Sequence, residues 1–93
     1  MISEFYDEES LINVLKAHLL PEDVKTINWE SVINNGEIYP NSIQGVDGCY
    51  IYQVDCVNGF VVVFVHPTIC TEVYYDAWTP KEVYMNRQKG EIW

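Results

Sequence analysis

The spacing of apolar residues near the start of the chain predicts an amphipathic helix. In the segment 6–20, YDEESLINVLKAHLL, residues such as Leu11 and Leu15 recur at intervals of three and four, which places them on one stripe of a helix. Asp7 stands where a helix cap is expected, and the acidic residues after it complement the helix dipole. Pro21 is expected to stop this helix.

A second, shorter helix is predicted just downstream. The segment 26–36, TINWESVINNG, carries a less regular apolar face, with Thr26 or Asp23 available as its cap. Gly36 is expected to end the helix in a left-handed conformation. Residues 36–48, GEIYPNSIQGVDG, are dense in turn-forming residues and therefore predict a loop.

The middle of the chain changes to the period-two pattern of β-strands. Asn58-Gly59 lies between two apolar runs, which is a strong signal for a two-residue hairpin turn. With these two residues in the turn, Val57 pairs with Phe60 and the other pairs continue outward. The strand 60–66, FVVVFVH, is apolar on both faces, as expected of a central strand with a neighbour on each side.

The same register divides the side chains of the hairpin between two faces of the sheet. The face expected to be core carries Tyr50, Tyr52, Val54 and Cys56 beside Val61, Val63 and Val65. The opposite face carries Ile51, Gln53, Asp55 and Val57 beside Phe60, Val62, Phe64 and His66.

The third strand and the last helix follow from the remaining pattern. Residues 70–78, CTEVYYDAW, alternate in a way that suits the second neighbour of the central strand. Thr79 and Glu82 with the intervening Pro form a capping box that opens a helix, and Gly90 is expected to end it. The expected fold is therefore an α+β domain over residues 1–93, with two N-terminal helices, a three-stranded antiparallel meander sheet and a C-terminal helix.

Charge narrows the classes of partner. The 93 residues include 14 acidic and five basic side chains, a formal net charge of −9, and 48% of them are hydrophobic. Such a chain has enough apolar residues for a packed core, while its charge repels nucleic acids and anionic lipids and attracts basic proteins. The acidic start lacks the features of a signal peptide, and the apolar run 60–65 is too short to span a bilayer. A cytoplasmic protein is expected, with no direct nucleic-acid or membrane partner.

Three cysteines and a histidine are candidates for a metal or nucleophilic site. Cys49 and Cys56 are seven residues apart on one expected strand, so they point to opposite faces. Cys49 and His66 share a face, and Cys70 on the third strand is a further candidate, but the sequence offers no fourth ligand and no oxyanion-hole motif. No metal, cofactor or catalytic residue is therefore expected.

The strongest candidate for a binding surface is the polar side of the third strand. Glu72, Tyr74, Asp76 and Trp78 are expected in one row, with Gln53 and Asp55 on the same face of the sheet. Aromatic side chains interleaved with carboxylates are typical of an interface with a basic protein. The competing interpretation is that a helix covers this face, which would bury Tyr74 and Trp78.

These features favour a non-catalytic acidic inhibitor. It would bind and mask the basic surface of a nuclease or another nucleic-acid-binding protein. An immunity protein that neutralises a bacterial nuclease toxin fits best, because the aromatic residues gather near one acidic segment. The alternatives are a phage anti-defence protein that acts as a DNA mimic and, from another class, a small Cys/His metal-binding domain or enzyme.

Overall fold

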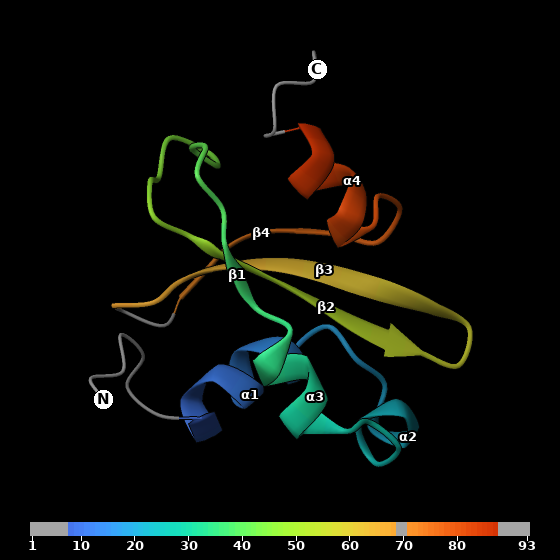
Figure 1. The fold of residues 1–93 in the computed structure, drawn as a ribbon. Coiled ribbons are helices and arrows are strands. Elements are labelled where there is room, and N and C mark those ends of the chain that lie inside the picture. Colours follow the sequence, from blue (N-terminus) through green and yellow to red (C-terminus); the bar gives the residue numbers. More distant parts are fainter. Residues whose placement is uncertain (1–7, 69–70, 88–93) are drawn as a thin grey trace.

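The computed structural model describes residues 8–68 and 71–87 and shows an α+β fold. Three helices, α1 (Glu8–Lys16), α2 (Pro21–Val24) and α3 (Trp29–Asn34), precede the sheet, and α4 (Lys81–Arg87) follows it. The sheet contains β1 (Glu37–Ile38), β2 (Tyr50–Cys56), β3 (Gly59–His66) and β4 (Thr71–Asp76) in the order β1-β2-β3-β4, with every pair antiparallel. The first three helices lie on one side of the sheet and α4 on the other (Figure 1).

The N-terminal region contains three helices rather than the two expected. Helix α1 has the predicted apolar stripe, and Leu11 and Leu15 are buried. It ends at Lys16, however, and Pro21 begins α2 instead of stopping α1. Proline is well suited to this first helical position, because its missing N–H has no partner there in any case. The cap expected from Asp7 lies outside the described residues.

Both ends of α3 differ from the expectation. The cap is Asn28, whose side chain accepts a hydrogen bond from the Ser31 N–H at 3.1 Å, and not Thr26 or Asp23. Gly36 is not among the residues with positive φ. Its role is close approach: a Cβ there would lie 2.3 Å from a ring carbon of Tyr52. Glycine is therefore needed where the chain leaves α3 and passes over the sheet.

The sheet has four strands rather than three, because β1 lies inside the segment 36–48 that was expected to be a loop. Its two residues are too few to show a period-two pattern. The hairpin turn is also displaced, since Cys56 pairs with Gly59 and the turn is Val57-Asn58. Every pair is thus shifted by two positions from the expected register. An even shift keeps each side chain on its face, so the predicted faces are correct.

Each face of the sheet has its own hydrophobic core, and the central strand β3 contributes to both. The core beneath the N-terminal helices contains Leu11, Leu15, Val32, Tyr52, Val54, Val63 and Val65. The core beneath α4 contains Tyr39, Cys49, Ile51, Val62, Phe64 and Tyr84. The last helix begins at Lys81, close to the expected capping box, and its expected end at Gly90 lies outside the described residues.

Candidate protein-binding surface

The predicted row of side chains along β4 is broken by an irregularity in the strand. Tyr74 pairs with Phe64 and Asp76 with Val62, so both face α4. The register then shifts between Phe64 and Val65, and Glu72 pairs with Val65 on the face of the N-terminal helices. The expectation that Glu72 shares a face with Tyr74 and Asp76 is therefore wrong. An extra residue in one strand, a β-bulge, reverses the alternation beyond it.

Glu72 is joined to α1 rather than to the face beneath α4. Its carboxylate contacts Nε2 of His18, which lies just beyond the end of α1. The His18 ring in turn packs on Tyr75, with ring centroids 4.1 Å apart. These three side chains connect the end of α1 to the outer strand of the sheet.

Asp76 is a buried anchor for α4 rather than a surface residue. It is 7% exposed, and its carboxylate accepts hydrogen bonds from the N–H groups of Trp78 at 2.6 Å and Thr79 at 3.1 Å. The Tyr84 hydroxyl donates to the other oxygen at 2.5 Å. Burial by itself raises the pKa of Asp76, but these hydrogen bonds outweigh it and the net pKa is lowered. Asp76 is therefore an ionised structural residue at neutral pH.

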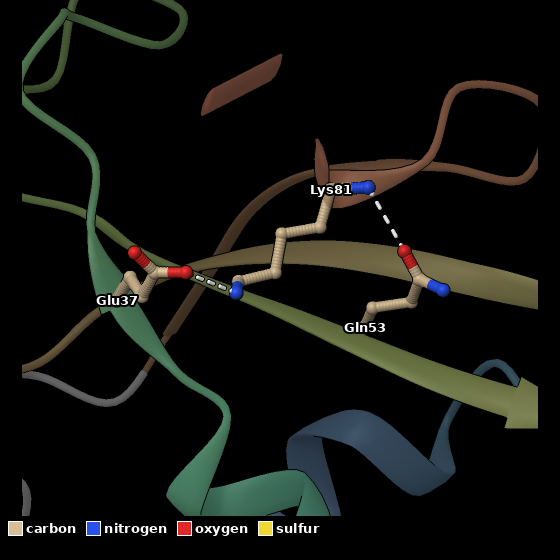
Figure 2. A network of polar contacts seen from close by, with 3 residues as sticks. All are labelled: Glu37, Gln53 and Lys81. Atoms are coloured by element: carbon tan, nitrogen blue, oxygen red, sulfur yellow. Dashed lines mark hydrogen bonds and ion pairs between the residues drawn. The ribbon is translucent and has the colours of Figure 1, made fainter. Parts of the chain in front are cut away.

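Gln53 also anchors α4, from β2 on the other side of β3. It pairs with Val62, which also pairs with Asp76, so Gln53 and Asp76 share a face as predicted. The backbone N–H of Lys81 donates to Gln53 Oε1 at 2.9 Å, and the Lys81 ammonium forms an ion pair with Glu37 (Figure 2). Gln53 thus accepts from the first residue of α4, where helical N–H groups have no partner within the helix.

Asp55 remains at the surface. It is exposed and pairs with Phe60, and Gln53 Nε2 donates to its carboxylate at 2.8 Å. The six predicted binding residues therefore occupy different places. Gln53 and Asp76 hold α4, Glu72 contacts His18, and the remaining three, Asp55, Tyr74 and Trp78, are exposed.

The exposed aromatic residues gather along β4 and the turn after it. Tyr74 is 38%, Tyr75 48% and Trp78 85% exposed. Within the described chain, β4 is the last strand on its side of the sheet. We call Glu72, Tyr74, Tyr75 and Trp78 the aromatic edge. A partner along this edge can contact both faces of β4, because Tyr74 and Tyr75 point to opposite sides.

Tyr75 was missed in the sequence, and the role of Asp76 was misjudged. Tyr75 alternates with Tyr74 and therefore lies on the other side of β4, yet it stays half exposed at the rim of the sheet. Asp76 did carry a signal, since a carboxylate two and three residues before Trp78 and Thr79 is suited to accept from their N–H groups.

Beside Tyr74, a cavity of about 490 Å³ is bordered by Tyr84 and residues 41–44.

Among the described residues, the cysteine and histidine side chains form no comparable site. Cys49 is buried, its thiol lies 3.9 Å from the Val46 carbonyl oxygen, and burial with the nearby Asp47 raises its pKa, which disfavours the nucleophilic thiolate. Nδ1 of His66 is buried and has no hydrogen-bond partner among the described residues. Cys70 lies outside those residues. In the part of the chain that is described, no group of three or more His, Cys, Asp or Glu side chains is arranged to hold a metal ion.

Comparisons with protein-family models, curated proteins and solved structures give no match. Among the helices of residues 8–68 and 71–87, none has the length and apolar character that crossing a membrane requires. The geometry of the chain itself must therefore support a proposal for its function.

Proposed function

We propose that the protein is a non-catalytic acidic inhibitor that binds a basic surface of a partner protein through the aromatic edge. The observation that carries the proposal is the exposure of Tyr74, Tyr75 and Trp78 together on the outer strand of a strongly acidic chain. Tyrosine and tryptophan contribute large contact areas at interfaces, and the net charge of −9 speeds the encounter with a basic partner.

Toxin immunity is the setting that this surface favours. A protein that imitates DNA needs carboxylates in extended rows at the spacing of phosphates, whereas an inhibitor of one enzyme needs a compact patch with aromatic anchors. The aromatic edge is of the second kind, because only one of its four residues, Glu72, is a carboxylate. The proposed partner is a nuclease whose basic nucleic-acid-binding surface is masked in a cytoplasmic complex.

The experiment identifies the protein that co-purifies with this chain from its native host and, where that protein is a nuclease, assays its inhibition. The double variant Tyr75→Ala/Trp78→Ala is expected to weaken inhibition by more than about tenfold, since truncation of an aromatic hot-spot residue costs about 2 kcal/mol or more. The matched control is Val57→Ala, which changes an apolar residue that is 77% exposed in the hairpin turn. Equal inhibition by the parent protein and the double variant would show that the aromatic edge is not the interface.

The rival class, a small metal-binding domain or enzyme, predicts a different result. Stoichiometric zinc in the purified protein, lost in Cys49→Ala and His66→Ala, would contradict the inhibitor proposal. So would an intrinsic activity that disappears in these variants while the fold survives. Circular dichroism checks the fold in each case.

A further inference from the structure

The sheet has a second edge, and half of β2 lies open along it. β1 pairs only with Tyr50 and Ile51, while β2 continues to Cys56. Among the described residues, no strand pairs with the stretch 53–56 on this side. An open strand edge presents backbone donors and acceptors in the arrangement that another strand would bind. We call the stretch 53–56 the β2 edge.

The backbone groups of Gln53 and Asp55 point toward this open side. The Tyr39 N–H donates to the Cys49 carbonyl at 2.8 Å, so the carbonyl of residue 49 is directed toward β1. Backbone groups alternate along an antiparallel strand, and the same direction therefore applies to residues 51, 53 and 55. Ile51 is opposite Glu37 of β1. Gln53 and Asp55 are left with two N–H and two C=O groups facing the open edge.

The β2 edge lies between two cavities that share Asn35 and Gln53. One, of about 390 Å³, extends toward α4 and is bordered by Glu37, Glu82 and Met85 among others. The second, of about 200 Å³, extends toward α3 and the segment before it and reaches Asp55. Figure 2 shows the α4 end of this region, where Gln53 and Glu37 approach Lys81 from two strands. The open edge thus has a recess on each side.

The charges of these recesses suit a cationic ligand. Asp55, Glu37 and Glu82 are exposed carboxylates along the recesses. Lys81 is the one basic side chain among the residues that border them, and it is paired with Glu37. Asn35 and Asn86 add side-chain amides, while Ile27 and Met85 add apolar contacts. A segment with alternating basic and apolar side chains matches this lining, because side chains alternate between the two sides of an added strand.

We propose that the β2 edge binds a short extended segment of a basic protein, which adds to the sheet as a strand beside Gln53 and Asp55. The segment continues the line of β1, takes hydrogen bonds from the backbone of these two residues, and directs lysine or arginine side chains to Asp55 and Glu82. Residues 53–56 span roughly 10 Å at the strand rise, which corresponds to a ligand of four or five residues. This inference goes beyond the proposed function, since it concerns the opposite edge of the sheet and holds whether or not the partner of the aromatic edge is a nuclease.

The test uses the full chain, labelled with ¹⁵N, and the capped peptide acetyl-KVRVK-amide as a defined probe. In the free protein the amides of Gln53 and Asp55 are expected to exchange rapidly with solvent. Addition of the peptide should protect both amides at least tenfold and shift their resonances, with little change along β4. In an antiparallel pair, the basic residues that share the face of Gln53 and Asp55 also direct their N–H groups toward β2. The matched probe is the same peptide with the backbone nitrogens of its arginine and last lysine methylated, which keeps the charge and removes two of these donors. It should bind at least tenfold more weakly.

Charge reversal tests the side-chain part of the proposal. Asp55→Lys should weaken binding of the unmodified peptide about tenfold, because an attractive contact becomes repulsive. The control Glu8→Lys changes the total charge equally on exposed α1 and should weaken it less than threefold. Equal binding of the two peptides, equal effects of the two variants, or shifts confined to β4 would each overturn strand addition. Amides of Gln53 and Asp55 that are already protected in the free chain would also overturn it. If this protection increases with protein concentration, a second copy of the chain occupies the edge. If it is independent of concentration, another part of the same chain occupies it.

Discussion

The two faces of the sheet are covered in different ways. The face beneath α1 and α3 is held by apolar packing, with Leu11 and Leu15 set against valines of β2 and β3. The face beneath α4 is covered by a helix of only seven residues, a length that is unstable on its own. Tyr84 packs edge-on against Phe64, with ring centroids 5.0 Å apart, and α4 donates hydrogen bonds to Asp76 and Gln53.

This difference explains why polar residues in the strands are unequal as binding candidates. On the apolar face, a polar side chain within the core would be costly. On the α4 face, the side-chain oxygens of Asp76 and Gln53 accept hydrogen bonds that hold the helix and its preceding turn, so these oxygens are not available to a partner. The partner surfaces that we propose are therefore at the two edges of the sheet. Four predictions test this contrast, beginning with the largest effect.

Leu15→Ala should destabilise the protein most. Leu15 is fully buried between α1 and the sheet, and truncation of such a leucine costs about 3–4 kcal/mol in transfer and cavity energy. Urea unfolding followed by circular dichroism measures the loss. The matched control is Leu20→Ala, which is 59% exposed and should cost less than about 0.5 kcal/mol. Equal losses at the two positions would show that α1 is not packed on the sheet as described.

Asp76→Ala should cost about 2–3 kcal/mol, because it leaves the buried Tyr84 hydroxyl and two backbone N–H groups without their acceptor. Asp55→Ala removes an exposed carboxylate and should change the free energy of unfolding by less than about 0.5 kcal/mol. The same urea experiment measures both. A small effect of Asp76→Ala would mean that polar contacts do not hold α4.

The contribution of Asp76 should also depend on pH. Its pKa is lowered in the folded protein, so the stabilisation is complete above the unfolded value of about 3.9 and is lost as pH falls through the folded value. The difference in unfolding free energy between the parent and Asp76→Ala should therefore shrink between pH 6 and pH 2. Urea midpoints across that range measure it, and comparison with the variant cancels the titration of the other carboxylates. A difference that stays constant with pH would contradict an ionised Asp76.

Period-two and helical patterns were sufficient to predict most of the sheet and α1, because these patterns follow directly from which side of an element is buried. The faces of β2 and β3 were correct although the hairpin turn was displaced, since the displacement is even. Two short elements, α2 and β1, were missed because four and two residues are too few to establish a period. Their positions depend on the packing of the whole chain.

The candidate site was predicted less well, for a specific physical reason. Alternation shows that a residue is on a given face, but it does not show whether a helix later covers that residue. Asp76 and Gln53 are covered, whereas Trp78 is 85% exposed. The irregularity beside Val65 also leaves no mark in the residue pattern, and it moves Glu72 to the opposite face. The segment was thus identified as rich in aromatic residues while their exposure was left open, and the single polar row expected along it was wrong.

Gln53→Met should give the smallest of the four effects and the most local one. The variant keeps the length of the side chain but removes the acceptor for the Lys81 N–H, at a cost of about 1 kcal/mol. Because that N–H begins α4, amide exchange within α4 should accelerate while exchange within α3 stays unchanged. Asp55→Asn separates the two hydrogen bonds of Gln53, since it alters only the partner of Nε2 and should leave α4 as stable as in the parent. Equal acceleration in α3 and α4, or an effect of Asp55→Asn as large as that of Gln53→Met, would show that Gln53 does not act by anchoring the start of α4.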